Sequence, residues 1–156
     1  ENTEVCAMIT DGEEAGLRGC KQWAKDHYDE YVNSGVETVV LCVDTLADLD
    51  YLRVYNKDMT GTVKNNQQFS QLVMDSAKDS GHNDLEFSSV YFGSSDAAAF
   101  SQAGITATCL AAMDPKPADY YHNRRDTAER LVPEAIKTGF DVIISTILNF
   151  DEKGLN

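Results

Sequence analysis

Two adjacent carboxylates, Glu13 and Glu14, stand where an apolar run ends and a helical pattern begins. In α/β proteins, ligands bind at such junctions, outside the carboxyl ends of strands. One carboxylate there can hold a metal ion while its neighbour transfers a proton, which is what metal-assisted hydrolysis requires. Acidic residues are also common in the first turn of a helix, because they complement its positive end. The pair alone is therefore compatible with either a catalytic or a purely structural role.

Three further polar residues follow expected strands. Asp44 closes the run 39–43, Asp96 lies at a strand–turn–helix junction, and His122 follows two tyrosines in a polar loop. Asp96 also fits an ordinary helix cap, and a single loop histidine is usually a solvated side chain. Glu, Asp and His from loops at one end of a sheet nevertheless supply the oxygen and nitrogen ligands that catalytic zinc takes.

The elements that must position these residues alternate between strand and helix patterns. The β-branched run 37–43 predicts a central strand, and the alternating run 51–55 predicts an antiparallel strand near an edge. The order predicts one α/β domain over residues 1–156, a three-layer α/β/α sandwich with a mixed, mostly parallel sheet. Further strands are expected at 3–9, 85–92 and 106–110, and helices at 16–33, 65–80, 96–103 and from Pro133 onward.

Composition excludes several classes of partner. The chain has 26 acidic and 13 basic residues, and the formal net charge of −13 argues against nucleic acid or an anionic membrane as partner. No apolar run is long enough to cross a membrane. The four cysteines form no CxxC pair, so we expect buried free thiols in a reducing compartment, the cytoplasm of a bacterium.

Three segments, taken in order, resemble the di-zinc aminopeptidases. This is a family of metallopeptidases that includes bacterial leucyl and Streptomyces-type aminopeptidases and has the glutaminyl cyclases as relatives. Residues 13–19 (Glu-Glu-Ala-Gly-Leu-Arg-Gly) resemble the family's Glu-Glu-x-Gly-Leu-x-Gly motif. Residues 95–105 resemble its Ser-Asp-His-x-x-Phe…Gly-Ile-Pro segment, with Ala97 in place of the histidine. Residues 121–127 resemble its Tyr-His-(x)3-Asp-Thr motif. The resemblance extends from residue 10 to 127, and the flanking pattern fits to about residue 152.

The resemblance implies a role for each matched residue. Glu13 is implied as the general base that takes a proton from the attacking water and returns it to the leaving amine. Glu14 and His122 are implied as zinc ligands, and Asp44 as a ligand of the zinc ion opposite the one held by Glu14. The implied cofactor is a pair of zinc ions in the complete domain, and the implied substrates are peptides with a free N-terminus.

One part of the family pattern is absent. The family has a His-x-Asp segment and a metal-bridging aspartate upstream of the Glu-Glu pair, and the thirteen residues before Glu14 contain neither. The sequence His27-Tyr28-Asp29 matches the His-x-Asp pattern, but it lies in an expected helix. Residues two apart in a helix point about 200° apart, so these two side chains cannot bind one metal ion together. We therefore expect the C-terminal part of a catalytic domain, without its N-terminal strands. We expect it to bind zero or one zinc ion and to lack peptidase activity.

Missing strands leave an exposed sheet edge, and such an edge predicts a homo-oligomer. Two other functions stay open at this stage. One is a related co-catalytic amidohydrolase or deacylase, which also uses a Glu-Glu pair. The other is an aminopeptidase-like module that binds without catalysis, although retention of Glu13, Glu14, Asp44 and His122 argues against it.

Overall fold

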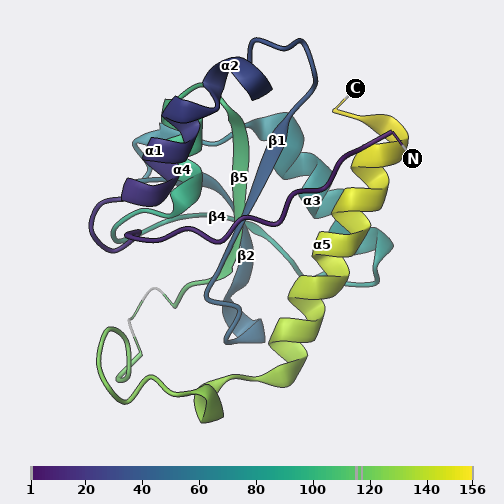
Figure 1. Cartoon of the computed structure of the whole chain (residues 1–156). Helices are drawn as coiled ribbons and strands as arrows, with labels where there is room; N and C mark the ends of the chain where they lie inside the picture. Colours follow the sequence, from purple (N-terminus) through teal and green to yellow (C-terminus); the bar gives the residue numbers. More distant parts are fainter. Residues whose placement is uncertain (1, 115, 117, 156) are drawn as a thin grey trace.

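The centre of the molecule is a mixed five-stranded sheet in the order β1-β5-β2-β3, with β4 pairing β2 (Figure 1). The computed structural model describes residues 2–114, 116 and 118–155. β1 pairs β5 and β2 pairs β4 in parallel, whereas β2 pairs β3 and β5 antiparallel. The expected excess of parallel pairings is therefore not found. The strands are β1 (Val39–Asp44), β2 (Leu52–Asp58), β3 (Val63–Lys64), β4 (Phe87–Ser89) and β5 (Thr106–Ala112).

Helices cover both faces of this sheet, so the expected α/β sandwich is confirmed (Figure 1). One face carries α1 and α4 around Phe100, with α2 following α1, and the other carries α3 and α5 around Phe69. The helices are α1 (Arg18–Asp26), α2 (Tyr28–Tyr31), α3 (Gln67–Asp79), α4 (Asp96–Gln102) and α5 (Pro133–Lys153), with 3-10 turns η1 (Leu49–Tyr51) and η2 (Ala128–Arg130).

Local chemistry explains where α3, α4 and α5 begin. Asn66 caps α3 by accepting a hydrogen bond from the Phe69 N–H at 2.9 Å, and Ser95 caps α4 through the Ala97 N–H. Pro133 occupies the first turn of α5, where backbone N–H groups have no hydrogen-bond acceptor within the helix, so the absence of an N–H in proline costs no hydrogen bond. The expected long helix from 16 to 33 is instead interrupted at His27, whose ring stacks on Trp23.

The strand expected at residues 3–9 is not formed. This segment is extended and crosses in front of the sheet (Figure 1), but it joins no strand, and Val5 and Ile9 are 59% and 99% exposed. Among the described residues, no neighbouring strand lies where its backbone could pair. A strand pattern in the sequence becomes a strand only when such a partner is present.

Because residues 3–9 form no strand, β1 also lies at a different position in the sheet than expected. The run 37–43 was expected to be central, yet β1 lies at an edge of the sheet with β5 on one side only. β2, expected near an edge, is antiparallel to β5 as predicted but lies inside the sheet. The free edge that we expected is therefore the outer edge of β1.

Three of the four cysteines are buried free thiols, as expected, and Cys6 is exposed. None of the described helices is long and apolar enough to span a membrane.

Candidate functional site

The Glu13-Glu14 pair lies in a tight loop that is folded back on α1. The Arg18 N–H donates to the Gly12 carbonyl at 3.1 Å, and the Glu13 carbonyl accepts from Leu17 N–H at 2.8 Å. Gly12 and Gly16 have φ of 61° and 98°, values that glycine adopts without steric cost. These hydrogen bonds fix the backbone beneath both carboxylates.

Gly19 allows this loop to approach α1 closely. Its N–H donates to the Asp11 carbonyl at 3.1 Å. A Cβ at residue 19 would lie only 2.4 Å from that carbonyl oxygen, closer than any real contact. The last glycine of the 13–19 motif is thus needed to bring the loop against the helix, and it positions the carboxylates indirectly.

Glu14 and His122 meet although they are far apart in the sequence. His122 Nε2 lies 2.9 Å from Glu14 Oε1, and the two side chains are 51% and 72% exposed. The His122 ring stacks on Tyr121, with centroids 3.8 Å apart. His122 has φ of 55°, a left-handed conformation that costs energy outside glycine and is enriched at functional sites.

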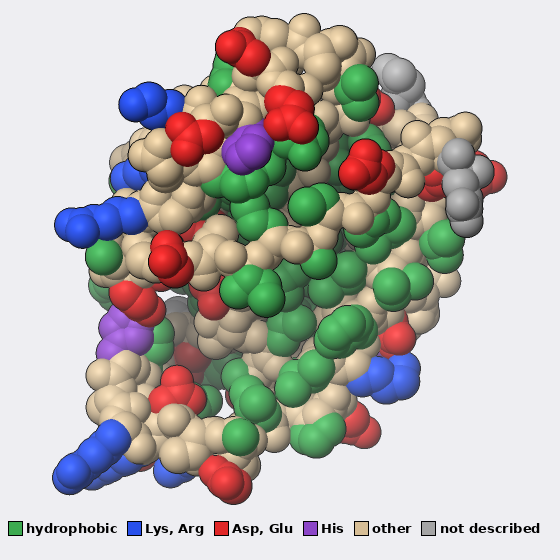
Figure 2. Space-filling model, viewed as in Figure 1, with side chains coloured by type: hydrophobic (Ala, Val, Ile, Leu, Met, Phe, Trp, Pro, Cys, Tyr) green, Lys and Arg blue, Asp and Glu red, His purple; other side chains and the backbone are tan. Residues whose placement is uncertain are grey.

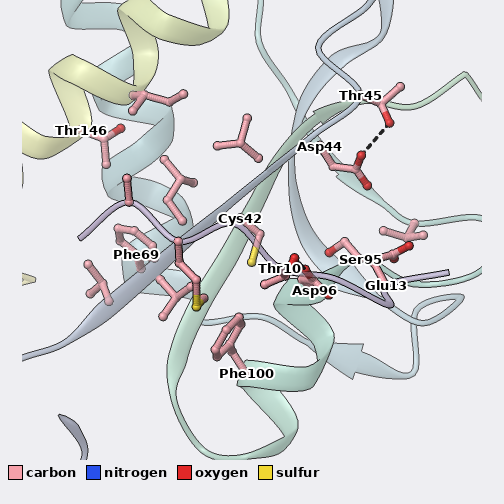
Figure 3. Close-up of a pocket in the computed structure, with 18 of the residues that line it drawn as sticks. Thr10, Glu13, Cys42, Asp44, Thr45, Phe69, Ser95, Asp96, Phe100 and Thr146 are labelled. Atoms are coloured by element: carbon pink, nitrogen blue, oxygen red, sulfur yellow. Dashed lines mark hydrogen bonds between the residues drawn. The ribbon is translucent and has the colours of Figure 1, made fainter. Parts of the chain in front are cut away.

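Asp44 lies at the carboxyl end of β1, where the parallel pairing places it beside Ala111 of β5. The chain leaves β5 at the same end of the sheet and continues into the loop that carries His122. Asp44 Oδ1 accepts a hydrogen bond from Thr45 Oγ1 at 2.8 Å (Figure 3), and Thr45 has φ of 46°. Parallel pairing of β1 and β5 therefore brings Asp44 and His122 to one end of the sheet.

The environment of Glu13 is unusual for a carboxyl group. Partial burial, followed by the negative charges of Glu14, Asp44 and Asp96, raises its pKa to about 7, and only His122 opposes the shift. A carboxyl with a pKa near neutrality can both accept and release a proton at the same pH, as a general base requires.

Asp96 holds the site together from the opposite side of the loop. Its carboxylate accepts hydrogen bonds from Thr10 Oγ1 at 2.6 Å and from Cys20 Sγ at 2.8 Å. Thr10 and Asp96 lie together with Glu13 in Figure 3. The sequence had left Asp96 as a possible helix cap, but Ser95 makes that cap, so Asp96 is free to tie the Glu13 loop to α4.

One important carboxylate, Asp58, was missed by the sequence analysis. It is fully buried at the end of β2 and accepts hydrogen bonds from Ser95 N–H at 3.0 Å, from Ser95 Oγ at 2.6 Å and from Met59 N–H at 2.7 Å. The sequence around it gave no indication, because an aspartate after a strand usually faces solvent.

The residues present fit part of a zinc site. Glu14 and His122 offer one oxygen and one nitrogen ligand within direct contact of each other, which suits zinc. Asp44 is not in contact with them. Across residues 2–114, 116 and 118–155, no three His, Cys, Asp or Glu side chains are gathered closely enough to hold a metal ion.

The carboxylates Glu13, Glu14, Asp44 and Asp96 line one end of a groove of about 1560 Å³. The groove continues past the site between residues 2–8 and β1, and α5 forms part of its wall. Green side chains follow α5 down the right-hand side of Figure 2. Phe140, Ile144 and Leu148 of this helix are exposed.

The fold and site together define an α/β protein with an acidic, histidine-containing site at the strand ends. The family model of Peptidase family M28 matches residues 2–147. The chain therefore belongs to Peptidase family M28. The comparison with curated protein sequences gave no match.

Solved structures share the fold at low sequence identity. LapA aminopeptidase of Legionella pneumophila has a TM-score of 0.71 at 16% identity, covering 89% of this chain and 37% of its own. A glutaminyl cyclase from an Acidobacteriales bacterium has a TM-score of 0.69 at 18% identity, covering 88% and 47%. BSAP, a zinc aminopeptidase from Bacillus subtilis, has a TM-score of 0.63 at 20% identity, covering 86% and 33%. The chain thus spans less than half the length of these three structures.

Proposed function

We propose that this chain contributes the Glu-Glu part of the active site of a zinc-dependent aminopeptidase, as the C-terminal part of its catalytic domain. Membership of the M28 family supports a metallopeptidase. The observation that carries the proposal is the contact between Glu14 and His122 at 2.9 Å, directly beside Glu13. In this proposal the remaining metal ligands come from polypeptide outside residues 1–156.

Each residue has a distinct task in the proposed reaction. Glu14 and His122 would hold one zinc ion and Asp44 would help to hold a second. Bound zinc supplies a Lewis acid that polarises the scissile carbonyl and lowers the pKa of water toward 7. Glu13 would remove a proton from the attacking water and deliver it to the leaving amine. The negative charges of the site favour substrates with a protonated N-terminus.

Zinc titration of the isolated chain tests the proposal. We expect at most one weakly bound ion, measured by competition with a chromophoric chelator, because Glu14 and His122 are the two of the three proposed ligands that are in contact. Binding should be lost in the double variant Glu14→Gln, His122→Asn. The exposed α5 variant Glu152→Gln removes one negative charge elsewhere and should bind as the wild type does. Equal binding by the double variant would contradict the proposed ligand pair.

Activity supplies the second test. The isolated chain should not hydrolyse leucine p-nitroanilide, and hydrolysis that both a chelator and Glu13→Gln abolish would contradict this expectation. In a longer polypeptide that supplies the other ligands, Glu13→Gln should lower kcat by about 10²–10⁴-fold. Comparison of free-amine with N-acylated substrates distinguishes an aminopeptidase from a deacylase.

A further inference from the structure

The outer side of α5 carries an apolar stripe that folding of the described chain leaves exposed. We propose that this stripe pairs α5 with α5 of a second copy of the chain, antiparallel, about a twofold axis at Ile144. The inference goes beyond the proposed function, since it requires neither zinc nor catalysis.

Three large apolar side chains follow one another along α5 at intervals of about one helical turn. Phe140, Ile144 and Leu148 are 59%, 52% and 65% exposed. At about 100° per residue, Phe140 and Leu148 lie within about 40° of Ile144 around the helix axis, whereas the buried Val142 lies about 160° away. The stripe therefore lies on the side of α5 opposite its packed face. Exposed apolar residues are ordinary when scattered, but a continuous row of them is typical of an interaction surface.

The two ends of the stripe carry opposite charges. Lys137 lies three residues before Phe140, and Asp151 lies three residues after Leu148. Both are within about 20° of Ile144 around the axis. Lys137 Nζ lies 2.6 Å from Asp141 Oδ2, and Asp151 Oδ1 accepts a hydrogen bond from Asn2 N–H. An ammonium has three donors and a carboxylate accepts at two oxygens, so each group can also pair across an interface.

The stripe is complementary to itself when its direction is reversed. From residue 137 to residue 151 the spacings are three, four, four and three residues, symmetric about Ile144. A twofold axis at Ile144 places Phe140 against Leu148 of the second copy and Lys137 against Asp151 of the second copy, each contact occurring twice. Spacings of three and four residues suit helices that pack about 20° from antiparallel. This self-complementarity selects a second copy as the occupant.

The size of the stripe and the charge of the chain predict weak, reversible pairing. The stripe is about 21 Å long, so one helix from each copy buries less than the roughly 1,000 Å² of a stable interface. The net charge of −13 on each copy opposes association, although 150 mM salt screens charges more than about 8 Å apart. We expect a dimer with a Kd of about 10–500 µM, measured by sedimentation equilibrium in 150 mM NaCl.

A charge on the axis tests the surface. Ile144→Glu brings two carboxylates together and should weaken the dimer at least tenfold, with an unchanged circular dichroism spectrum because Ile144 is half exposed. The control Gln68→Glu adds the same charge at an exposed position of α3 and should change the Kd less than twofold. A chain that stays monomeric up to 1 mM would overturn the proposal. So would a dimer that Ile144→Glu leaves intact, because association would then use another surface, such as the edge of β1.

A charge exchange tests the pairing of Lys137 with Asp151. Lys137→Glu and Asp151→Lys should each weaken the dimer about three- to tenfold, because each leaves two like-charged contacts. The double variant has the net charge of the wild type and forms both pairs again with reversed signs. It should restore the Kd to within about twofold. A double variant no tighter than the single variants would contradict the antiparallel arrangement.

Disulfide cross-linking tests the register in a Cys6→Ser background, which lacks the exposed thiol. Under mild oxidation, Ile144→Cys should form a covalent dimer. Phe140→Cys and Leu148→Cys should each cross-link slowly alone and at least fivefold faster when mixed. Gln68→Cys is the exposed control on α3 and should cross-link slowly. Equal rates for the mixture and for Phe140→Cys alone would overturn the proposed axis.

Discussion

At the scale of single residues, two carboxylates hold the loop of the candidate site in place through hydrogen bonds within the chain. Asp58 fixes the start of α4 through hydrogen bonds from Ser95. Asp96, which follows Ser95 in the sequence, fixes the loop of Glu13 through Thr10. These two aspartates are distinct from Glu13 and Glu14, to which the proposed function gives chemical roles.

Asp58→Ala should be among the most destabilising substitutions of a polar residue. It removes the acceptor of the buried Ser95 N–H and of the partly buried Met59 N–H and leaves both without this partner, at a cost of about 2–4 kcal/mol. Urea unfolding measures the loss. The exposed control Asp84→Ala should stay within about 0.5 kcal/mol of the wild type. A similar small effect at Asp58 would show that its hydrogen bonds contribute little.

The sequence predicted which residue types could do chemistry better than it predicted what supports them. Glu14 and His122, singled out by motif, are in contact in the structure. Asp58 lies outside every motif, and its burial depends on the end of β2 meeting Ser95, the cap residue of α4, a contact that spacing along the chain does not encode. The roles assigned to Glu13, Glu14, Asp44 and His122 stay predictions until metal binding and catalysis are measured.

At the scale of elements, the approach of the Glu13 loop to α1 depends on one glycine. Gly19→Ala places a methyl group against the backbone oxygen of Asp11, which cannot move without moving the loop. We expect a loss of about 1–3 kcal/mol in unfolding free energy. We also expect amide chemical-shift changes that extend to residues 12–14.

Gly139→Ala in α5 is the matched control, since it is also a helical glycine facing a close neighbour. The neighbour is the flexible end of Leu46, at 2.5 Å, which can rotate away. A helical alanine also gains about 1 kcal/mol of intrinsic propensity. Gly139→Ala should therefore be close to neutral, and a loss as large as that of Gly19→Ala would contradict the role given to the Asp11 contact.

Helices were easier to predict than strands for a physical reason. α3 and α4 carry their own N-caps, α5 begins with a proline, and all three have their own apolar faces, so local sequence determines them closely. A strand depends on a neighbour. Residues 3–9 have a strand pattern without a partner, and β3, with two residues, has a partner but almost no pattern.

At the scale of the whole molecule, the buried thiols make the free energy of unfolding decrease at alkaline pH. Burial, and in addition the hydrogen bond to Asp96, raises the pKa of Cys20 to about 12. Burial also raises the pKa of Cys42 and Cys109 well above their ordinary value, and that of Tyr55 to about 12. Above pH 9 the unfolded chain loses protons that the folded chain retains, so unfolding free energy must fall as pH rises.

Urea midpoints at pH 7, 9 and 10.5 measure this effect. We expect no thiol-dependent change between pH 7 and 8 and a progressive decrease above pH 9. Cys6→Ser, at the exposed thiol, should leave the profile unchanged. A flat profile to pH 11 would contradict the burial of the other three thiols.

The expected self-association through a sheet edge now has a specific location at β1. Because each copy carries a net charge of −13, salt should promote association by screening the repulsion. Sedimentation velocity between 50 mM and 1 M NaCl tests this expectation.

The two ends of the described chain meet on α5, where the Asn2 N–H donates to Asp151 Oδ1 at 2.7 Å (Figure 1). A short linker from residue 155 to residue 2 would therefore close the polypeptide into a ring with little disturbance. Reopening that ring at the exposed turn around Gly81 gives a circular permutant. In its chain order His122 precedes Glu13, Glu14 and Asp44. The sheet, and no longer the order of the motifs, would then be what assembles the site.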